Sequence, residues 1–236
     1  MLPGPLQRLL VISPHCDDAV FSCGALLAAH PGSVVVTIFA AGPPCHDHLT
    51  EWDRTAGFEP GDDVMAHRRR EDAQALGLLS AHPLWLDFCD SQYRRSPSIA
   101  RITSALDGVI QLVRPHSIVA PWGLFHSDHT LASEACIGLR SKYPSRGWFL
   151  YEDAIYRGIP GLLGDRIARM QACGVHARRV AVATDRDCTR KPEAVHCYRS
   201  QLRALTSRGR PGYLDAFEPE RLWVIESPPA ARRSHT

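Results

Sequence analysis

The chain has 236 residues, of which 44% are hydrophobic and 22% are charged, and its formal net charge is +2. These values are typical of a globular domain and give no reason to expect a nucleic acid or a membrane as partner. No apolar run approaches the roughly 18 residues of a membrane span. The N-terminus lacks the charged and apolar regions of a signal peptide. We therefore expect a soluble, cytoplasmic protein.

The eight cysteines are scattered along the chain and form no Cys-x-x-Cys pair. A disulfide framework is typical of short secreted chains, and structural zinc sites usually show paired spacing. We therefore expect most of these cysteines to be small buried side chains or inert thiols.

Apolar, β-rich runs alternate with helix-like stretches. The expected strands are residues 8–12, 34–40, 83–88, 117–121, 147–151 and 179–183. The expected helices are residues 19–29, 63–79, 98–113, 129–141 and 187–206. Strands that alternate with helices of ten or more residues predict βαβ units. The fold class is therefore α/β, with a mainly parallel sheet in a single domain of residues 1–227.

Three stretches fall outside this alternation. Residues 41–61 are long, polar and proline-rich, and we expect them to form a flap at the active site rather than a domain boundary. Residues 207–219 are irregular. Residues 228–236 are expected to be a disordered tail.

A first chemistry-bearing cluster follows the apolar run at residues 9–12, and its sequence is His15-Cys16-Asp17-Asp18. The carboxyl ends of strands in an open α/β sheet are where ligands bind. His15 and Asp18 are three residues apart at a strand-to-helix turn, so both side chains can face one metal ion. Asp17 would then be free to accept a proton. The alternative is that the two aspartates only cap the following helix.

A second cluster, His126-Ser127-Asp128-His129, follows the apolar run at residues 118–120. Taken alone, it is better interpreted as a loop histidine followed by an aspartate that caps a helix. Both clusters, however, lie at strand ends of one predicted sheet. Together they offer the His and carboxylate ligands of a catalytic zinc, so we predict a metal site.

The first cluster and its flanks, from Val11 to Gly24, resemble the Pro-His-x-Asp-Asp motif of the LmbE-like / PIG-L zinc-dependent N-deacetylases. The second cluster is similar to the His-Pro-Asp-His motif of the same family. Weaker similarity covers residues 68–77, 151–153 and 191–201. The changes at Cys16, Ala19 and Ser127 remove no expected ligand or base.

The resemblance implies a Rossmann-like sheet with helices on both faces and hydrolysis of an acetamide on an amino sugar. It implies one Zn²⁺ per chain, or another divalent metal. The expected metal ligands are His15, Asp18 and His129. The expected catalytic residues are Asp17 as general base, a protonated His126 beside the oxyanion, and Asp128 as hydrogen-bond partner of a neighbouring histidine.

Arg68 is the expected substrate-binding residue, although a solvated basic helix face is an equal interpretation of residues 68–70. The expected partner is a small N-acetylated amino sugar, and self-association is left open. Two other functions remain: a zinc amidase that acts on a non-sugar amide, and a sugar- or nucleotide-binding module without catalysis. The dinucleotide version of the latter requires a Gly-x-Gly-x-x-Gly motif after the first strand, which this chain lacks.

Overall fold

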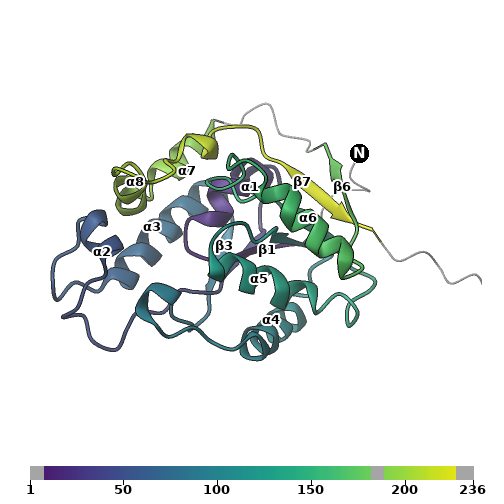
Figure 1. Ribbon diagram of the computed structural model, residues 1–236, viewed down its shortest axis with the longest axis horizontal. Helices are drawn as coiled ribbons and strands as arrows, with labels where there is room; N and C mark the ends of the chain where they lie inside the picture. Colours follow the sequence, from purple (N-terminus) through teal and green to yellow (C-terminus); the bar gives the residue numbers. More distant parts are fainter. Residues whose placement is uncertain (1–7, 182–188, 227–236) are drawn as a thin grey trace, which may run out of the picture.

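A computed structural model describes residues 8–181 and 189–226 (Figure 1). Within these residues, seven strands form one sheet in the order β3-β2-β1-β4-β5-β7-β6. Their bounds are β1 Leu9–Ser13, β2 Val34–Thr37, β3 His82–Trp85, β4 Ser117–Pro121, β5 Gly147–Tyr151, β6 Ala177–Val180 and β7 Leu222–Ile225. The first five strands pair in parallel, whereas β7 is antiparallel to both β5 and β6.

The central strand β1 is buried on both faces of the sheet. Leu9 and Val11 belong to one apolar core, while Leu10 and Ile12 belong to the other. This division follows from the pleat, because successive side chains of a strand point to opposite faces. It also explains why the run is continuously apolar, which is typical of parallel sheets covered on both sides.

Eight helices lie in the described residues. Their bounds are α1 Asp18–Ala29, α2 Glu51–Ala56, α3 Val64–Leu78, α4 Ile99–Val113, α5 Ser127–Ile137, α6 Leu162–Ala172, α7 Arg190–His196 and α8 Arg199–Leu205. Side chains of α1, α3, α7 and α8 contribute to one core. Side chains of α4, α5 and α6 contribute to the other. The predicted α/β class, the mainly parallel sheet and the helices on both faces are confirmed.

The helix α1, which begins at the first cluster, is tied to the C-terminal part of the chain. It is kinked at Cys23, where the backbone leaves helical geometry. The Glu220 carboxylate accepts hydrogen bonds from the backbone N–H groups of Ala25 and Leu26, at 2.6 and 3.0 Å. The same carboxylate receives Lys191 Nζ at 2.8 Å. A buried ion pair therefore supplies partners for N–H groups next to the kink.

Some predicted elements differ from the structure. The helix expected at residues 187–206 is two helices within the described residues, because Tyr198 adopts a non-helical backbone with φ −82° and ψ 54° between them. The helices α2 and α6 and the strand β7 were not predicted. The helix α6 lies in a segment rich in glycine and proline, and these residues obscure the helical pattern in the sequence.

The described residues include only part of the segments to which the remaining expectations about organisation apply. The expected tail at 228–236 lies outside the described residues, as do parts of the elements expected at 179–183 and 187–206. Within the described residues, none of the helices combines the length and apolar character that crossing a membrane requires.

Candidate metal centre

The two predicted clusters meet at the carboxyl ends of β1 and β4, which are adjacent in the sheet. From β1 the chain crosses to β2 on one side, and from β4 it crosses to β5 on the other. This reversal of direction is the topological switch point, where open α/β sheets form a crevice for ligands. The fold thus places two segments more than 100 residues apart in sequence around one crevice.

Three buried side chains converge there: His15, Asp18 and His129 offer ligand atoms that all lie within 4.8 Å of one another. Oδ2 of Asp18 lies 3.2 Å from His15 Nδ1 and 3.2 Å from His129 Nε2. Ligands about 2.0–2.1 Å from a tetrahedral zinc ion lie roughly 3.3 Å apart. The observed separations therefore fit the edges of such a coordination shell, and the donor set suits a divalent metal.

The electrostatic surroundings of this cluster favour a cation. Burial opposes protonation of His15, yet Asp90, Asp128 and Asp18 outweigh it and raise the pKa of His15 well above its usual value. Burial likewise opposes protonation of His129, but Asp18 and Asp153 raise its pKa to about 9. Buried carboxylates that hold protons on imidazoles can equally hold a metal ion, which competes with those protons.

His129 is oriented by a carboxylate that the motif analysis did not assign to it. Nδ1 of His129 lies 2.6 Å from Asp153 Oδ1. The other oxygen of Asp153 accepts hydrogen bonds from the backbone N–H groups of Gly123 and Leu124, at 3.1 and 3.0 Å. A carboxylate at this distance holds the proton on Nδ1, which leaves Nε2, the nitrogen that faces Asp18, as the one that can bind a metal ion. This is the usual outer contact of a metal-binding histidine.

Asp128, which follows β4, contacts His15, which follows the adjacent strand β1. Its Oδ2 lies 3.2 Å from His15 Nε2 and accepts a hydrogen bond from the backbone N–H of Ser91 at 3.0 Å. Oδ2 of Asp90 is 3.5 Å from the same imidazole nitrogen. Because these carboxylates occupy Nε2, the nitrogen of His15 that faces Asp18 is Nδ1.

Asp17 lies at the first turn of α1, but its side chain makes no capping hydrogen bond. It is buried and lines the same pocket. Burial and the charge of Asp18 raise the pKa of Asp17 to about 6, against the opposing charge of Arg68. A carboxylate with such a pKa is suited to proton transfer near neutral pH. The helix-cap interpretation therefore does not describe the Asp17 side chain.

Arg68 is buried beside two of the acidic side chains that line the pocket rather than on a solvated helix face. Its guanidinium lies 3.7 Å from Asp17 Oδ1 and 4.0 Å from Asp90 Oδ2. Its Nε has no hydrogen-bond partner among the described residues. A buried donor without a partner is costly unless water or a ligand satisfies it.

His126 lies directly before α5, and its Nδ1 accepts a hydrogen bond from the backbone N–H of Asp128 at 3.2 Å. Burial lowers the pKa of His126, and the neighbouring His15 and His129 lower it further. These contacts favour the neutral imidazole with its proton on Nε2. A protonated His126 is the expectation from the sequence, whereas these surroundings favour the neutral form.

The pocket around the cluster has a volume of about 260 Å³ and draws its walls from distant parts of the chain. Two of the three stretches that fall outside the predicted alternation, residues 41–61 and 207–219, contribute to these walls. Trp52 comes from α2 and Arg210 from the segment before β7. Nε1 of Trp52 donates a hydrogen bond to Gln201 Oε1 at 3.0 Å, which fixes the indole. Tyr156 packs edge-on against His129, with ring centroids 5.2 Å apart.

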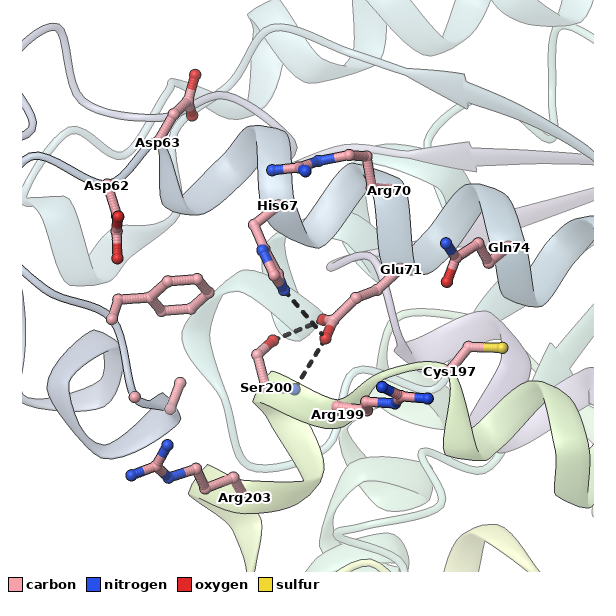
Figure 2. A pocket seen from close by; sticks show the side chains of 13 residues that line it. Asp62, Asp63, His67, Arg70, Glu71, Gln74, Cys197, Arg199, Ser200 and Arg203 are labelled. Carbon is pink, nitrogen blue, oxygen red and sulfur yellow. Dashed lines mark hydrogen bonds and ion pairs between the residues drawn. The ribbon is translucent and has the colours of Figure 1, made fainter.

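A larger pocket of about 660 Å³ lies elsewhere, between α3 and α8 (Figure 2). Its most buried groups already bind one another, since Glu71 accepts hydrogen bonds from the backbone N–H and the hydroxyl of Ser200, at 2.9 and 2.6 Å. His67 Nε2 lies 3.6 Å from the same carboxylate. These contacts join α3 to α8 and offer no unpaired acid or nucleophile.

The fold is a doubly wound α/β sheet, and the His and Asp side chains gathered at its switch point could hold a metal ion. The family model of PIG-L, described as GlcNAc-PI de-N-acetylase, matches residues 10–139, which is more than half of the chain. The chain belongs to this family, and the resemblance seen in the motifs is confirmed.

Named relatives agree with this assignment. The chain is 31% identical over 176 residues to a 2'-N-acetylparomamine deacetylase of Streptomyces fradiae, and the match spans 64% of this chain and 58% of that protein. A deacetylase triple mutant involved in the teicoplanin biosynthetic pathway is similar in structure. It has a TM-score of 0.75 and 25% identity, over 95% of this chain and 100% of the other.

The fold is also similar to that of the zinc-inhibited form of teicoplanin deacetylase. Here the TM-score is 0.76 and the identity 22%, over 95% of this chain and 100% of the other. At this identity the similarity supports the fold alone.

Proposed function

We propose that this protein is a metal-dependent N-deacetylase that removes an acetyl group from an amino-sugar-containing small molecule. The observation that carries the proposal is the convergence of His15, Asp18 and His129 in one pocket. Asp17 lies beside them, and its side chain is not used in a capping hydrogen bond. Family membership supports the reaction class.

In this proposal three side chains hold one divalent cation: His15 through Nδ1, Asp18 through its carboxylate, and His129 through Nε2. The cation would polarise the acetamide carbonyl and lower the pKa of a water molecule. Asp128 and Asp153 hold the two imidazoles in the required orientation, because each lies against the imidazole nitrogen that points away from Asp18. The residues of the chain itself then have to move one proton and stabilise one negative charge.

Asp17 takes the proton from the attacking water and later returns it to the departing amine. Arg68 keeps Asp17 ionised until that moment, since its positive charge opposes the effect of burial on the pKa of Asp17. Nε2–H of His126 donates a hydrogen bond to the carbonyl oxygen as negative charge develops on it. Losing one such donor typically slows a reaction by about 10²–10³-fold.

Size and polarity support an amino sugar as the substrate. At about 260 Å³, the pocket is smaller than the roughly 300–1,000 Å³ of sites for drug-sized ligands, so it suits one sugar ring rather than a whole glycoconjugate. Arg68 lines the pocket, so its guanidinium offers donors to a sugar hydroxyl. The relatives named above include deacetylases of an N-acetylated aminoglycoside intermediate and of the teicoplanin pathway.

We propose zinc as the metal, with other divalent ions as outcomes of the test. His and Asp ligands bind zinc well but do not exclude similar ions. One structural relative is described as a zinc-inhibited form, so both zinc and alternative ions need to be assayed over a range of concentrations.

We further propose that residues 1–227 form the deacetylase domain and that the protein acts in the cytoplasm. The seven cysteines of the described residues are all free thiols, which suits a reducing compartment.

Acetate release from chelator-treated protein tests the proposal. The protein is reconstituted with one metal at a time and given N-acetylglucosamine, its glycosides, N-acetylparomamine and a non-sugar acetamide. We expect acetate from the amino sugars only when metal is present. Faster release from the non-sugar amide would favour the amidase, and binding without any release would favour a sugar-binding module.

A further inference from the structure

The backbone between β4 and α5 makes a strained turn at Phe125. The N–H of His126 donates a hydrogen bond to the carbonyl oxygen of Leu124 at 2.7 Å. Phe125 is thus the central residue of a three-residue turn, and its φ is +60°. A γ-turn with positive φ is rare and strained, and for a bulky side chain this region is a genuine outlier. A glycine would adopt the same backbone without that strain.

The strain is not explained by packing. The Phe125 side chain is 67% exposed, whereas the neighbouring Leu124 is 1% exposed and anchors the turn in the core. Asp153 also stabilises the turn, because its carboxylate accepts hydrogen bonds from the backbone N–H groups of Gly123 and Leu124. The backbone therefore has its own supports, and the fold does not require an aromatic ring at this position.

The ring lies at the rim of the pocket that holds the candidate metal ligands. It packs on Tyr156 with centroids 5.1 Å apart and planes 31° apart. Tyr156 in turn packs edge-on against His129, at 5.2 Å. Three rings thus lead from the candidate metal ligand outward, and Phe125 is the outermost. Its exposed face is available to whatever extends from the reacting sugar.

We propose that Phe125 is a specificity-determining residue that binds a flat, apolar group attached to the amino sugar, such as an aryl aglycone. This inference rests on the proposed function. The volume of about 260 Å³ accommodates the sugar, so the attached group lies at the rim, where Phe125 is exposed. An aromatic ring offers such a group area and a favourable stacking geometry. Backbone strain retained at a binding surface is a recognised feature of functional sites.

Two matched ligands test the inference: p-nitrophenyl and methyl N-acetyl-β-glucosaminide, which differ only in the aglycone. The protein variants are Phe125→Gly, which removes both ring and strain, Phe125→Ala, which removes the ring alone, and Phe125→Tyr, which keeps the ring. Leu112→Ala is the control, since Leu112 is 76% exposed on α4 and does not line the pocket.

We expect KM for the aryl glycoside to rise about 10-fold in the glycine and alanine variants, given the usual worth of one aromatic contact. KM for the methyl glycoside should stay within about twofold, because its small aglycone makes little contact with the ring of Phe125. The tyrosine variant and the control should behave as the wild type. The thermal midpoint of Phe125→Gly should equal or exceed that of the wild type, because the turn no longer holds a bulky side chain at positive φ.

An unchanged preference for the aryl glycoside in Phe125→Gly would overturn the inference. So would a fall in its thermal midpoint of more than about 4 °C, which corresponds to about 1 kcal/mol or more and would show that the ring serves the fold. Failure of the proposed function has a different result, namely no acetate from any glycoside. In that case Kd values for the two glycosides, measured by calorimetry on metal-loaded Asp17→Asn protein with and without Phe125→Gly, decide the role of Phe125 by themselves.

Discussion

Replacing Asp153 with asparagine tests whether His129 binds the metal through Nε2. In the structure three donors face the two carboxylate oxygens of Asp153: Nδ1–H of His129 and the backbone N–H groups of Gly123 and Leu124. Asparagine keeps one oxygen and replaces the other by an NH₂ group. If its oxygen stays with the two backbone groups, the NH₂ group faces Nδ1 of His129, and the imidazole must move its proton to Nε2.

The expected loss is large because the lone pair that binds the metal is then occupied. Changing such an outer carboxylate typically weakens metal binding by about 10–100-fold, which corresponds to about 1.4–2.7 kcal/mol. Competition with a fluorescent zinc chelator measures the Kd directly. Asp165→Asn is the matched control, since Asp165 is exposed on α6 and the same chemical change there should leave the Kd unchanged.

Equal zinc affinity in Asp153→Asn and wild-type protein, with both folded by circular dichroism, would refute this reasoning. His129 would then not be held by Asp153 for metal binding, and the ligand set would need revision.

Three further predictions concern the base, a buried carboxyl and a buried ion pair. Asp17→Asn should reduce acetate release by at least about 10²-fold while zinc content by elemental analysis stays that of the wild type; near-normal turnover would reject Asp17 as the base. Burial raises the pKa of Asp72 to about 7 despite hydrogen bonds from Trp85 and Tyr198. The folded state therefore binds this proton more tightly than the unfolded chain, whose Asp pKa is about 3.9. As the pH rises from about 4 to about 7, the free energy of unfolding consequently falls, by at most about 1.4 kcal/mol per pH unit. Denaturant unfolding from pH 5 to pH 8 should show a shallower decline in Asp72→Asn than in the wild type, and parallel curves would contradict this. Lys191→Met should destabilise the fold by about 3–5 kcal/mol, because it leaves the buried Glu220 without its cation. Lys142→Met, which removes an exposed ion pair, should change the unfolding free energy little, and similar losses in both variants would argue against a special role for the buried pair.

The central strands and the two clusters were predictable because their signals are local. The apolar run of β1 is continuous because both faces of the strand are buried, and polar residues at its carboxyl end stand out against it. His15 and Asp18 needed no knowledge of distant segments. The interpretation of His129 as a ligand depends on both clusters, because the second cluster alone also fits a loop histidine followed by a helix cap.

The outer contacts were not predictable from such patterns. Asp90 lies beside His15 only because β3 and β2 place their loops next to β1, and in the sequence it looks like any aspartate at a turn. Asp153 follows the strand β5, within the weak similarity at residues 151–153, and no sequence pattern connects it with His129. Its contact with His129 depends on the spacing between neighbouring strands. The position of β7 between β5 and β6 is likewise set by long-range pairing.

The backbone at Phe125 could not be foreseen either. The sequence of residues 123–126 does not predict a positive φ at a phenylalanine, because the local preference of such a residue is a negative φ. Only the hydrogen bond from His126 to Leu124 and the support from Asp153 show how this conformation is maintained.

The central claim is that His15, Asp18 and His129 hold one divalent cation. Anomalous diffraction at the zinc absorption edge, from crystals grown with one equivalent of zinc, tests it most directly. We predict one strong peak within bonding distance of His15 Nδ1, an Asp18 carboxylate oxygen and His129 Nε2. A peak between His15, His126 and Asp128, the alternative group with suitable spacing in the described residues, would contradict the ligand set, and the lack of any peak in this pocket would contradict the metal site itself.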